Sequence, residues 1–97
     1  MQVVTKEYLV YDVSNDTGYS RGMVSAILDS VCSNIGTHLA NGRRVQINGF
    51  GVFQPKYRRP RTGHNPRTGE AVPIPETIAP VFNPSKKLRD FVGGRQV

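Results

Sequence analysis

The sequence predicts an α+β fold in one small domain, with a helical first half and an extended second half. All seven prolines of the 97-residue chain lie between Pro55 and Pro84, so long helices are confined to the residues before them. Apolar residues recur at helical spacing up to Leu39 and alternate at strand spacing from Val45. With 8% aromatic residues and no tryptophan, so short a chain has a thin core, and a partner subunit is expected to complete it.

Residues 5–41 are predicted to form a helical hairpin. Thr5 is placed to cap a first helix that carries Leu9 and Val13 and ends at Gly18, and Ser20 is placed to cap a second. The second helix has an apolar stripe at i, i+3/i+4 and i+7 spacing, made of Val24, Ile27, Leu28, Val31, Ile35 and Leu39. Asn41-Gly42 is expected to end this helix.

Residues 43–82 are predicted to form strands that continue into an arm. Val45 and Ile47 alternate with polar residues, residues 49–51 supply a tight turn, and the chain returns through Val52 and Phe53. Residues 56–61 then carry four cations. Neighbours on a strand point to opposite faces, so this segment cannot lie on an apolar core and must project into solvent or a ligand.

The arm is expected to turn at residues 62–69, which are rich in turn formers. Residues 71–78 return as an extended segment in which Pro73 and Pro75 exclude a central strand, and Val81 and Phe82 are expected to be buried.

A short C-terminal helix is predicted over residues 85–92, with Ser85 as its cap. Lys86 and Lys87 lie in its first turn, where the helix dipole disfavours positive charge. A phosphate bound at this helix start would explain both lysines. The alternative is that two exposed lysines there have little effect, and local reasoning does not choose between the two.

Positive charge is concentrated in the middle of the chain. The net charge is +6, and no carboxylate lies between Asp29 and Glu70. That interval contains seven cations, namely Arg43, Arg44, Lys56, Arg58, Arg59, Arg61 and Arg67. Such self-repulsion favours an anionic partner, and nucleic acid in particular, over a face that only confers solubility.

Four segments in order resemble the HU/IHF family of bacterial histone-like DNA-binding proteins. They are Asn-Gly-Phe-Gly-Val-Phe at 48–53, the basic residues 56–61, Asn-Pro-Arg-Thr-Gly-Glu at 65–70 and Phe-Asn-Pro-Ser-Lys-Lys-Leu at 82–88. The resemblance implies a single domain over residues 1–97 that forms an intertwined dimer. Each subunit would contribute a helical base, a small antiparallel sheet and a protruding two-stranded β-arm. It also implies an architectural protein that binds the minor groove of double-stranded DNA and bends or compacts it, largely without sequence preference.

The same resemblance assigns roles to individual residues. HU and IHF insert apolar wedges into the minor groove, and Pro66 matches the arm-tip proline that intercalates. The implied DNA-binding residues are Lys56, Arg58, Arg59, Arg61, His64, Asn65, Pro66, Arg67, Lys86 and Lys87, and the implied dimer-core residues are Phe50, Phe53 and Phe82. The chain departs from the family pattern in several places. Pro55, Pro60 and Pro75 are expected to stiffen or bulge the arm, and the first helix carries fewer charges than usual. His64 replaces an arginine, so its charge depends on pH, and Phe91 is bulky enough to extend the core.

The sequence argues against several other functions. It offers no recognisable catalytic set and no cofactor fingerprint, so an enzyme is not expected. Cys32 is expected in the core, and His38 lies about 240° away around the helix, so a metal site is not expected either. A lone cysteine and the absence of a membrane span or a signal peptide fit a cytoplasmic, nucleoid-associated protein of a bacterium or of a virus that infects one.

Two alternative functions stay open at this point, an RNA-binding protein of ribosomal type and a module whose basic arm binds an acidic protein. The sequence also leaves open whether the partner subunit is identical or a related chain, and whether binding favours a particular site.

Overall fold

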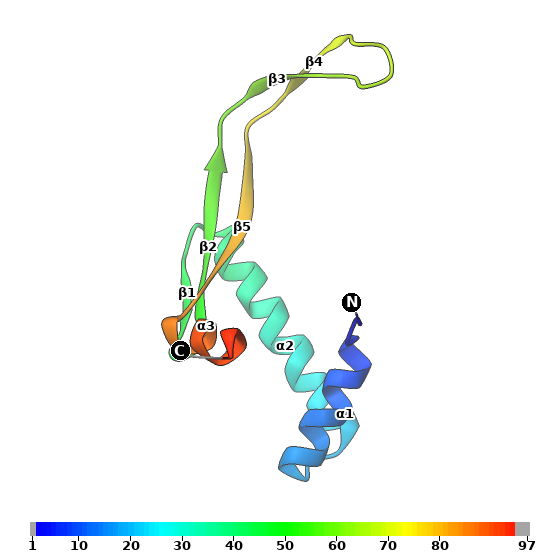
Figure 1. The fold of residues 1–97 in the computed structure, drawn as a ribbon, viewed down its shortest axis with the longest axis vertical. Helices are drawn as coiled ribbons and strands as arrows, with labels where there is room; N and C mark the ends of the chain where they lie inside the picture. The colour runs from blue at the N-terminus through cyan, green and yellow to red at the C-terminus, as the bar shows by residue number, and fades with distance from the viewer. Residues whose placement is uncertain (1, 95–97) are drawn as a thin grey trace. The chain divides into compact units, whose positions relative to one another are not determined.

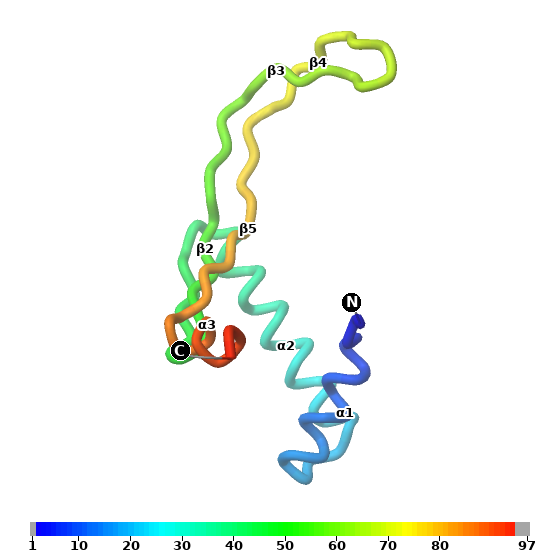
Figure 2. Tube along the Cα trace, in the orientation of Figure 1, coloured from blue at the N-terminus to red at the C-terminus, as the bar shows by residue number. Residues whose placement is uncertain are grey.

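The computed structural model describes residues 2–94 of the chain, which form three helices and five strands (Figures 1 and 2). In order, these are α1 (Lys6–Thr17), α2 (Arg21–Ala40), β1 (Val45–Ile47), β2 (Gly51–Arg58), β3 (Arg61–His64), β4 (Ala71–Ile74), β5 (Thr77–Pro84) and α3 (Lys86–Gly93). The predicted α+β class is confirmed. The chain divides into two compact units, Met1–Gly36 and Thr37–Val97, and the boundary falls within α2.

The helices begin and end where the local signals predicted. The Thr5 hydroxyl accepts a hydrogen bond from the Tyr8 N–H at 3.3 Å, and the Ser20 hydroxyl accepts one from the Met23 N–H at 3.1 Å. Gly18 ends α1 with a φ of 81°, a left-handed conformation that favours glycine. The hairpin is therefore specified by hydrogen bonds between residues close together in the chain. The residue types that form such bonds can be recognised in the sequence.

The helices of the first unit bury very few side chains. Val10 and Val24 are each 6% exposed, whereas Ile27 and Val31 of the predicted apolar stripe are 55% and 44% exposed. Cys32 is exposed as well, so the prediction that it is a core residue is wrong for the single chain. The stripe has the periodicity of a core-facing surface, but one chain alone does not cover it.

The second unit contains a three-stranded antiparallel sheet in the order β1-β2-β5. The predicted turn lies between β1 and β2, and its Phe50 N–H donates to the Ile47 carbonyl at 2.9 Å. Phe50, Phe53 and Phe82 form one cluster, with ring centroids 4.7 to 6.5 Å apart. Phe82 is nevertheless 38% exposed, so its predicted burial is not reached within one chain.

Gly51 lies against the Phe82 ring, and no larger residue fits there. A Cβ atom at this position would come within 2.6 Å of both the Asn83 carbonyl oxygen and the Phe82 ring. The glycine therefore lets β2 and β5 approach closely at the base of the hairpin.

The outer part of the hairpin is a separate two-stranded ribbon of β3 and β4, whose register runs from Arg61 opposite Ile74 to His64 opposite Ala71. Two expectations were wrong here. The basic segment 56–61 is not one continuous strand, and the tip loop starts at Asn65 because residues 62–64 are paired in β3. Pro73 is tolerated in β4 because a two-stranded ribbon leaves each strand with an unpaired edge.

The C-terminal helix α3 is capped as predicted, since the Ser85 hydroxyl accepts from the Leu88 N–H at 3.1 Å. Gly94 follows it with a φ of 78°. Phe91 projects from this helix with 83% of its surface exposed, so it does not extend a core within one chain.

Candidate nucleic-acid interface

The tip of the arm is a short loop closed by its own backbone. The Asn65 N–H donates to the Glu70 carbonyl at 2.8 Å, and the Gly69 N–H donates to the Asn65 carbonyl at 2.7 Å. Gly69 takes a φ of 76°, which allows the chain to reverse. Pro66 is exposed within this loop and has no N–H that would need a partner. The loop thus holds an apolar ring at the far end of the hairpin.

Asn65 shapes the loop with one end of its side chain. Its Oδ1 atom accepts from the Arg67 N–H at 2.8 Å. The Nδ2 group has no hydrogen-bond partner among the residues that the structure describes. That amide group is the donor that a minor-groove acceptor on a base would use.

The cations of the arm are exposed and have no carboxylate partners. Within residues 2–94, ion pairs join only Lys6 to Asp29 and Lys86 to Asp90. The exposed arm cations outside these pairs are Lys56, Arg58, Arg59, Arg61 and Arg67. They run from β2 through β3 to the tip loop, and the exposed side chain of His64 lies at the outer end of β3. The structure thus gathers the predicted arm residues on one hairpin.

The two lysines at the start of α3 differ from each other. The Lys86 ammonium contacts the Asp90 carboxylate at 2.8 Å, with the two side chains 80% and 57% exposed. An exposed i,i+4 pair contributes only about 0.3–0.5 kcal/mol, so an arriving phosphate can compete with Asp90 for the lysine. Lys87 has no ion pair in the described chain. Of the two predicted DNA-binding lysines, Lys86 is thus in an ion pair and Lys87 is not.

One contact in the arm was missed by sequence reasoning. The Tyr57 hydroxyl of β2 donates to the Glu76 carboxylate at 2.7 Å. This hydrogen bond, together with desolvation, raises the pKa of Tyr57 above its usual value of 10.0. The two residues are 19 positions apart, and no local pattern links them.

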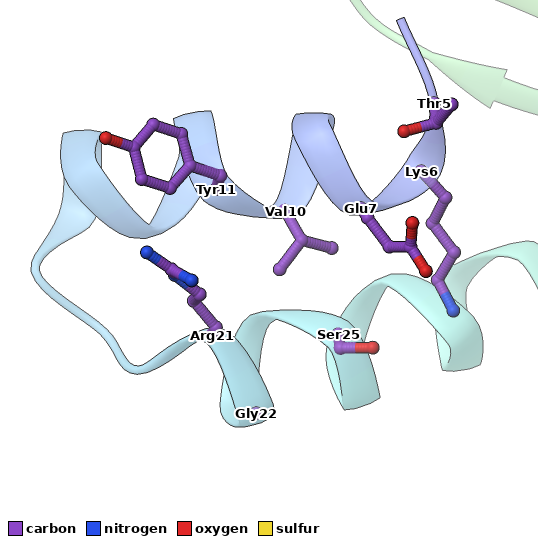
Figure 3. A pocket seen from close by; sticks show the side chains of 8 residues that line it. All are labelled: Thr5, Lys6, Glu7, Val10, Tyr11, Arg21, Gly22 and Ser25. Atoms are coloured by element: carbon purple, nitrogen blue, oxygen red, sulfur yellow. The ribbon is translucent and has the colours of Figure 1, made fainter.

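The first unit contains a pocket of about 670 Å³ along α1 and α2 (Figure 3). Its two cations are already engaged, because Lys6 pairs with Asp29 and the Arg21 guanidinium lies 4.8 Å from the centre of the Tyr11 ring.

In residues 2–94, no three His, Cys, Asp or Glu side chains gather as a metal site would require. None of the helices in that range is long and apolar enough to cross a membrane.

The chain is similar to known proteins over nearly its whole length. The family described as bacterial DNA-binding protein matches residues 4–93. The DNA-binding protein HU of Thermus thermophilus is 42% identical over 91 residues, which cover 94% of each chain. Integration host factor subunit beta of Marinobacter nauticus is 40% identical over 90 residues, or 92% of each chain. The structure of Anabaena HU in a cocrystal with DNA matches with a TM-score of 0.87 and 31% identity, covering 94% of this chain and 99% of that one.

Proposed function

Because the chain belongs to the family of bacterial DNA-binding proteins, which includes HU and integration host factor, we propose that it is an architectural protein that binds and bends duplex DNA. Family membership makes it a DNA-binding protein and not an enzyme. The observation that carries the proposal is the hairpin of β2–β5, with its row of exposed, unpaired cations and an exposed proline at its tip.

The arm supplies the electrostatic part of binding. Each cation that neutralises a phosphate releases condensed counterions, so the five arm cations outside ion pairs give a strong, salt-dependent and sequence-independent attraction. A two-stranded ribbon is thin enough to follow a groove, and Asn65 would donate to minor-groove acceptors there. Lys86 and Lys87 would contact phosphates at the start of α3, with Lys86 leaving Asp90 to do so.

Pro66 supplies the bend. Its ring would enter a base step and unstack it, at a cost of a few kcal/mol that additional DNA contacts offset. HU and IHF use apolar wedges in this way, and the tip loop of this chain holds a proline ring where such a wedge is needed.

We propose further that the protein acts as a dimer. Its buried hydrophobic residues in the described range are Val10, Val24 and Leu39 alone, which is far too few for a stable domain. The α2 stripe and the cluster of Phe50, Phe53 and Phe82 would be covered by a second subunit, identical or related. Two subunits would present two arms to one duplex, at the nucleoid or on a viral genome within a bacterium.

Binding to RNA is the second function that the sequence left open. Single-stranded RNA is recognised by bases that stack on aromatic rings, and duplex RNA has a wide, shallow minor groove. Apart from the imidazole of His64, Tyr57 is the only aromatic ring between Gln54 and Val81, and its hydroxyl is engaged with Glu76. The arm therefore offers no stacking platform, and duplex DNA is the better match.

The test is a competition among intact duplex DNA, nicked duplex DNA and RNA of equal length, measured at several salt concentrations together with a fluorescence-transfer bending assay. We expect duplex binding that weakens steeply with salt, a measurable bend, and tighter binding to the nicked duplex, which has already lost some stacking. Equal affinity for RNA, or binding to DNA without a bend, would contradict the proposal.

A further inference from the structure

One basic side chain of the arm has a charge that is not fixed. His64 lies at the outer end of β3, next to the tip loop (Figure 1). It is the only histidine among residues 55–78, and the other basic residues there are lysines and arginines, which stay charged near neutral pH. Histidine is the side chain whose charge ordinarily changes between about pH 5 and pH 8. His64 is therefore the arm residue at which pH can change the attraction for phosphate.

The paired strands give His64 no charged neighbour on its own face. Thr62 lies two positions before it on β3 and shares that face, because side chains alternate along a strand. On β4, Ala71 lies opposite His64, and Pro73 lies opposite Thr62. None of these three residues has an ionisable side chain. The exposed imidazole therefore meets solvent on this face of the ribbon and not a carboxylate.

The charged residues nearest to His64 in the chain lie elsewhere. Arg61 belongs to the opposite face of β3, and Arg67 and Glu70 belong to the tip loop. No ion pair joins His64 to Glu70, and in the part of the chain that the structure describes the His64 ring has no hydrogen-bond partner. Both ring nitrogens are thus available to a ligand that approaches the arm.

The other histidine of the chain has a different environment. His38 lies in the last turn of α2, outside the arm. Its Nδ1 atom accepts a hydrogen bond from the Arg43 Nε–H at 3.0 Å. A protonated ring could not accept this bond, because both of its nitrogens would be donors. The two histidines therefore differ in the property that matters here, and His38 is a matched control for His64.

We propose that His64 binds DNA in its charged form, so that each arm takes up a proton when it binds a duplex near neutral pH. This inference rests on the proposed function, in which the arm enters the minor groove. A narrow minor groove has a strong negative potential, which attracts histidine as well as arginine and lysine. A nearby negative charge stabilises the charged form of a basic group. Protons and DNA therefore favour each other's binding, by the same factor in both directions.

The first test measures affinity for an intact duplex at constant ionic strength, from about pH 5.5 to about pH 8, where histidine changes its charge. A close opposite charge changes the proton affinity of a group by about tenfold or more, so the parent should bind roughly fivefold more tightly per arm at the acid end. His64→Arg should bind tightly, and His64→Gln weakly, at every pH. His38→Gln should keep the parental pH dependence. The same pH dependence in the parent and in His64→Gln would overturn the proposal.

The second test compares the salt dependence of binding at the two ends of this pH range. A charged His64 that neutralises a phosphate adds about 0.9 to the magnitude of the negative slope of log K against log salt. The parental slope should therefore be steeper at acid pH, by about this amount for each arm, while His64→Gln should have one slope at both pH values. A parental slope that does not change with pH would show that His64 does not bind as a cation.

The third test follows the two imidazole rings directly by NMR during a pH titration, in the free protein and in its complex with the duplex. The titration midpoint of His64 should move to higher pH in the complex, and that of His38 should not follow it. An unmoved His64 midpoint would refute the inference. If the parent binds the duplex equally well at every pH, this inference alone fails. If it does not bind the duplex at any pH, the proposed function fails as well.

Discussion

We expect substitutions at Pro66 to separate bending from binding, because its ring is exposed in a loop whose hydrogen bonds come from its neighbours. Pro66→Ala removes two methylene groups from the wedge. At about 0.8 kcal/mol each, their loss should weaken binding to an intact duplex by roughly tenfold and reduce the bend. A nicked duplex has less stacking to disrupt, so the loss there should be smaller.

Arg67→Ala is the control in the same loop, because it removes a charge and leaves the wedge. It should reduce the salt dependence of binding while keeping the bend angle. Circular dichroism checks that both variants fold. If Pro66→Ala bends the intact duplex as sharply as the parent at saturating protein, Pro66 is a turn residue only.

Lys86 should contribute less than Arg58 or Arg61 to the salt dependence of binding. Arg58→Ala and Arg61→Ala should each lower the magnitude of the negative slope of log K against log salt by about 0.9 for each phosphate that is no longer neutralised. Lys86→Ala should lower it by less, because Asp90 already offsets the lysine charge. Asp90→Asn should accordingly raise affinity. Equal slopes for Lys86→Ala and Arg58→Ala would show that Asp90 has no such effect.

At the scale of single elements, Gly51 fixes how closely β2 and β5 approach each other. A Cβ atom there would overlap the Asn83 carbonyl oxygen and the Phe82 ring, so Gly51→Ala should destabilise the fold by about 1–3 kcal/mol. At Gly22 of α2, a Cβ atom would have open space around it to 4 Å, and Gly22→Ala should leave stability unchanged or raise it slightly. Urea denaturation measures both. A Gly51→Ala variant as stable as the parent would mean that the two strands separate easily.

The helices could be predicted because their signals are local. Thr5, Gly18, Ser20 and Ser85 act on backbone groups within a few residues, so the sequence contains the whole interaction. The arm follows other rules. Its prolines excluded a central strand but did not locate the break in strand pairing after Arg58, because that break depends on which residue of β2 faces which residue of β5. The hydrogen bond from Tyr57 to Glu76 depends on the same pairing.

Burial was the other property that sequence reasoning misjudged. Cys32, Phe82 and Phe91 have apolar side chains in apolar patterns, yet all three are exposed in the single chain. A periodic pattern shows that a face avoids water without showing which molecule covers it. The resemblance to HU and IHF, in contrast, is confirmed over residues 4–93, since it depended on four separate segments in the expected order.

For the whole molecule, folding and association should be a single process. Exposed apolar residues such as Ile27, Phe50 and Phe82 leave one chain with too small a core to fold alone. The melting temperature should therefore rise with protein concentration, as for any protein stabilised by its own assembly. Thermal melts at protein concentrations that span about a hundredfold range measure this dependence, and analytical ultracentrifugation measures the state of association. A folded monomer at micromolar concentration, or a melt independent of concentration, would contradict it.

The arm has a break in its strand pairing, between Arg58 opposite Thr77 and Arg61 opposite Ile74, and this break makes the arm modular. Both strands leave the same number of residues unpaired there, so the register of the inner sheet does not depend on the length of the outer ribbon. Paired insertions or deletions beyond the break, or exchange of residues 61–74 for the corresponding ribbon of a relative, would leave the phenylalanine cluster and the helices undisturbed. The ribbon proposed to reach the DNA could thus diversify in evolution while the part proposed to hold two subunits together stays the same.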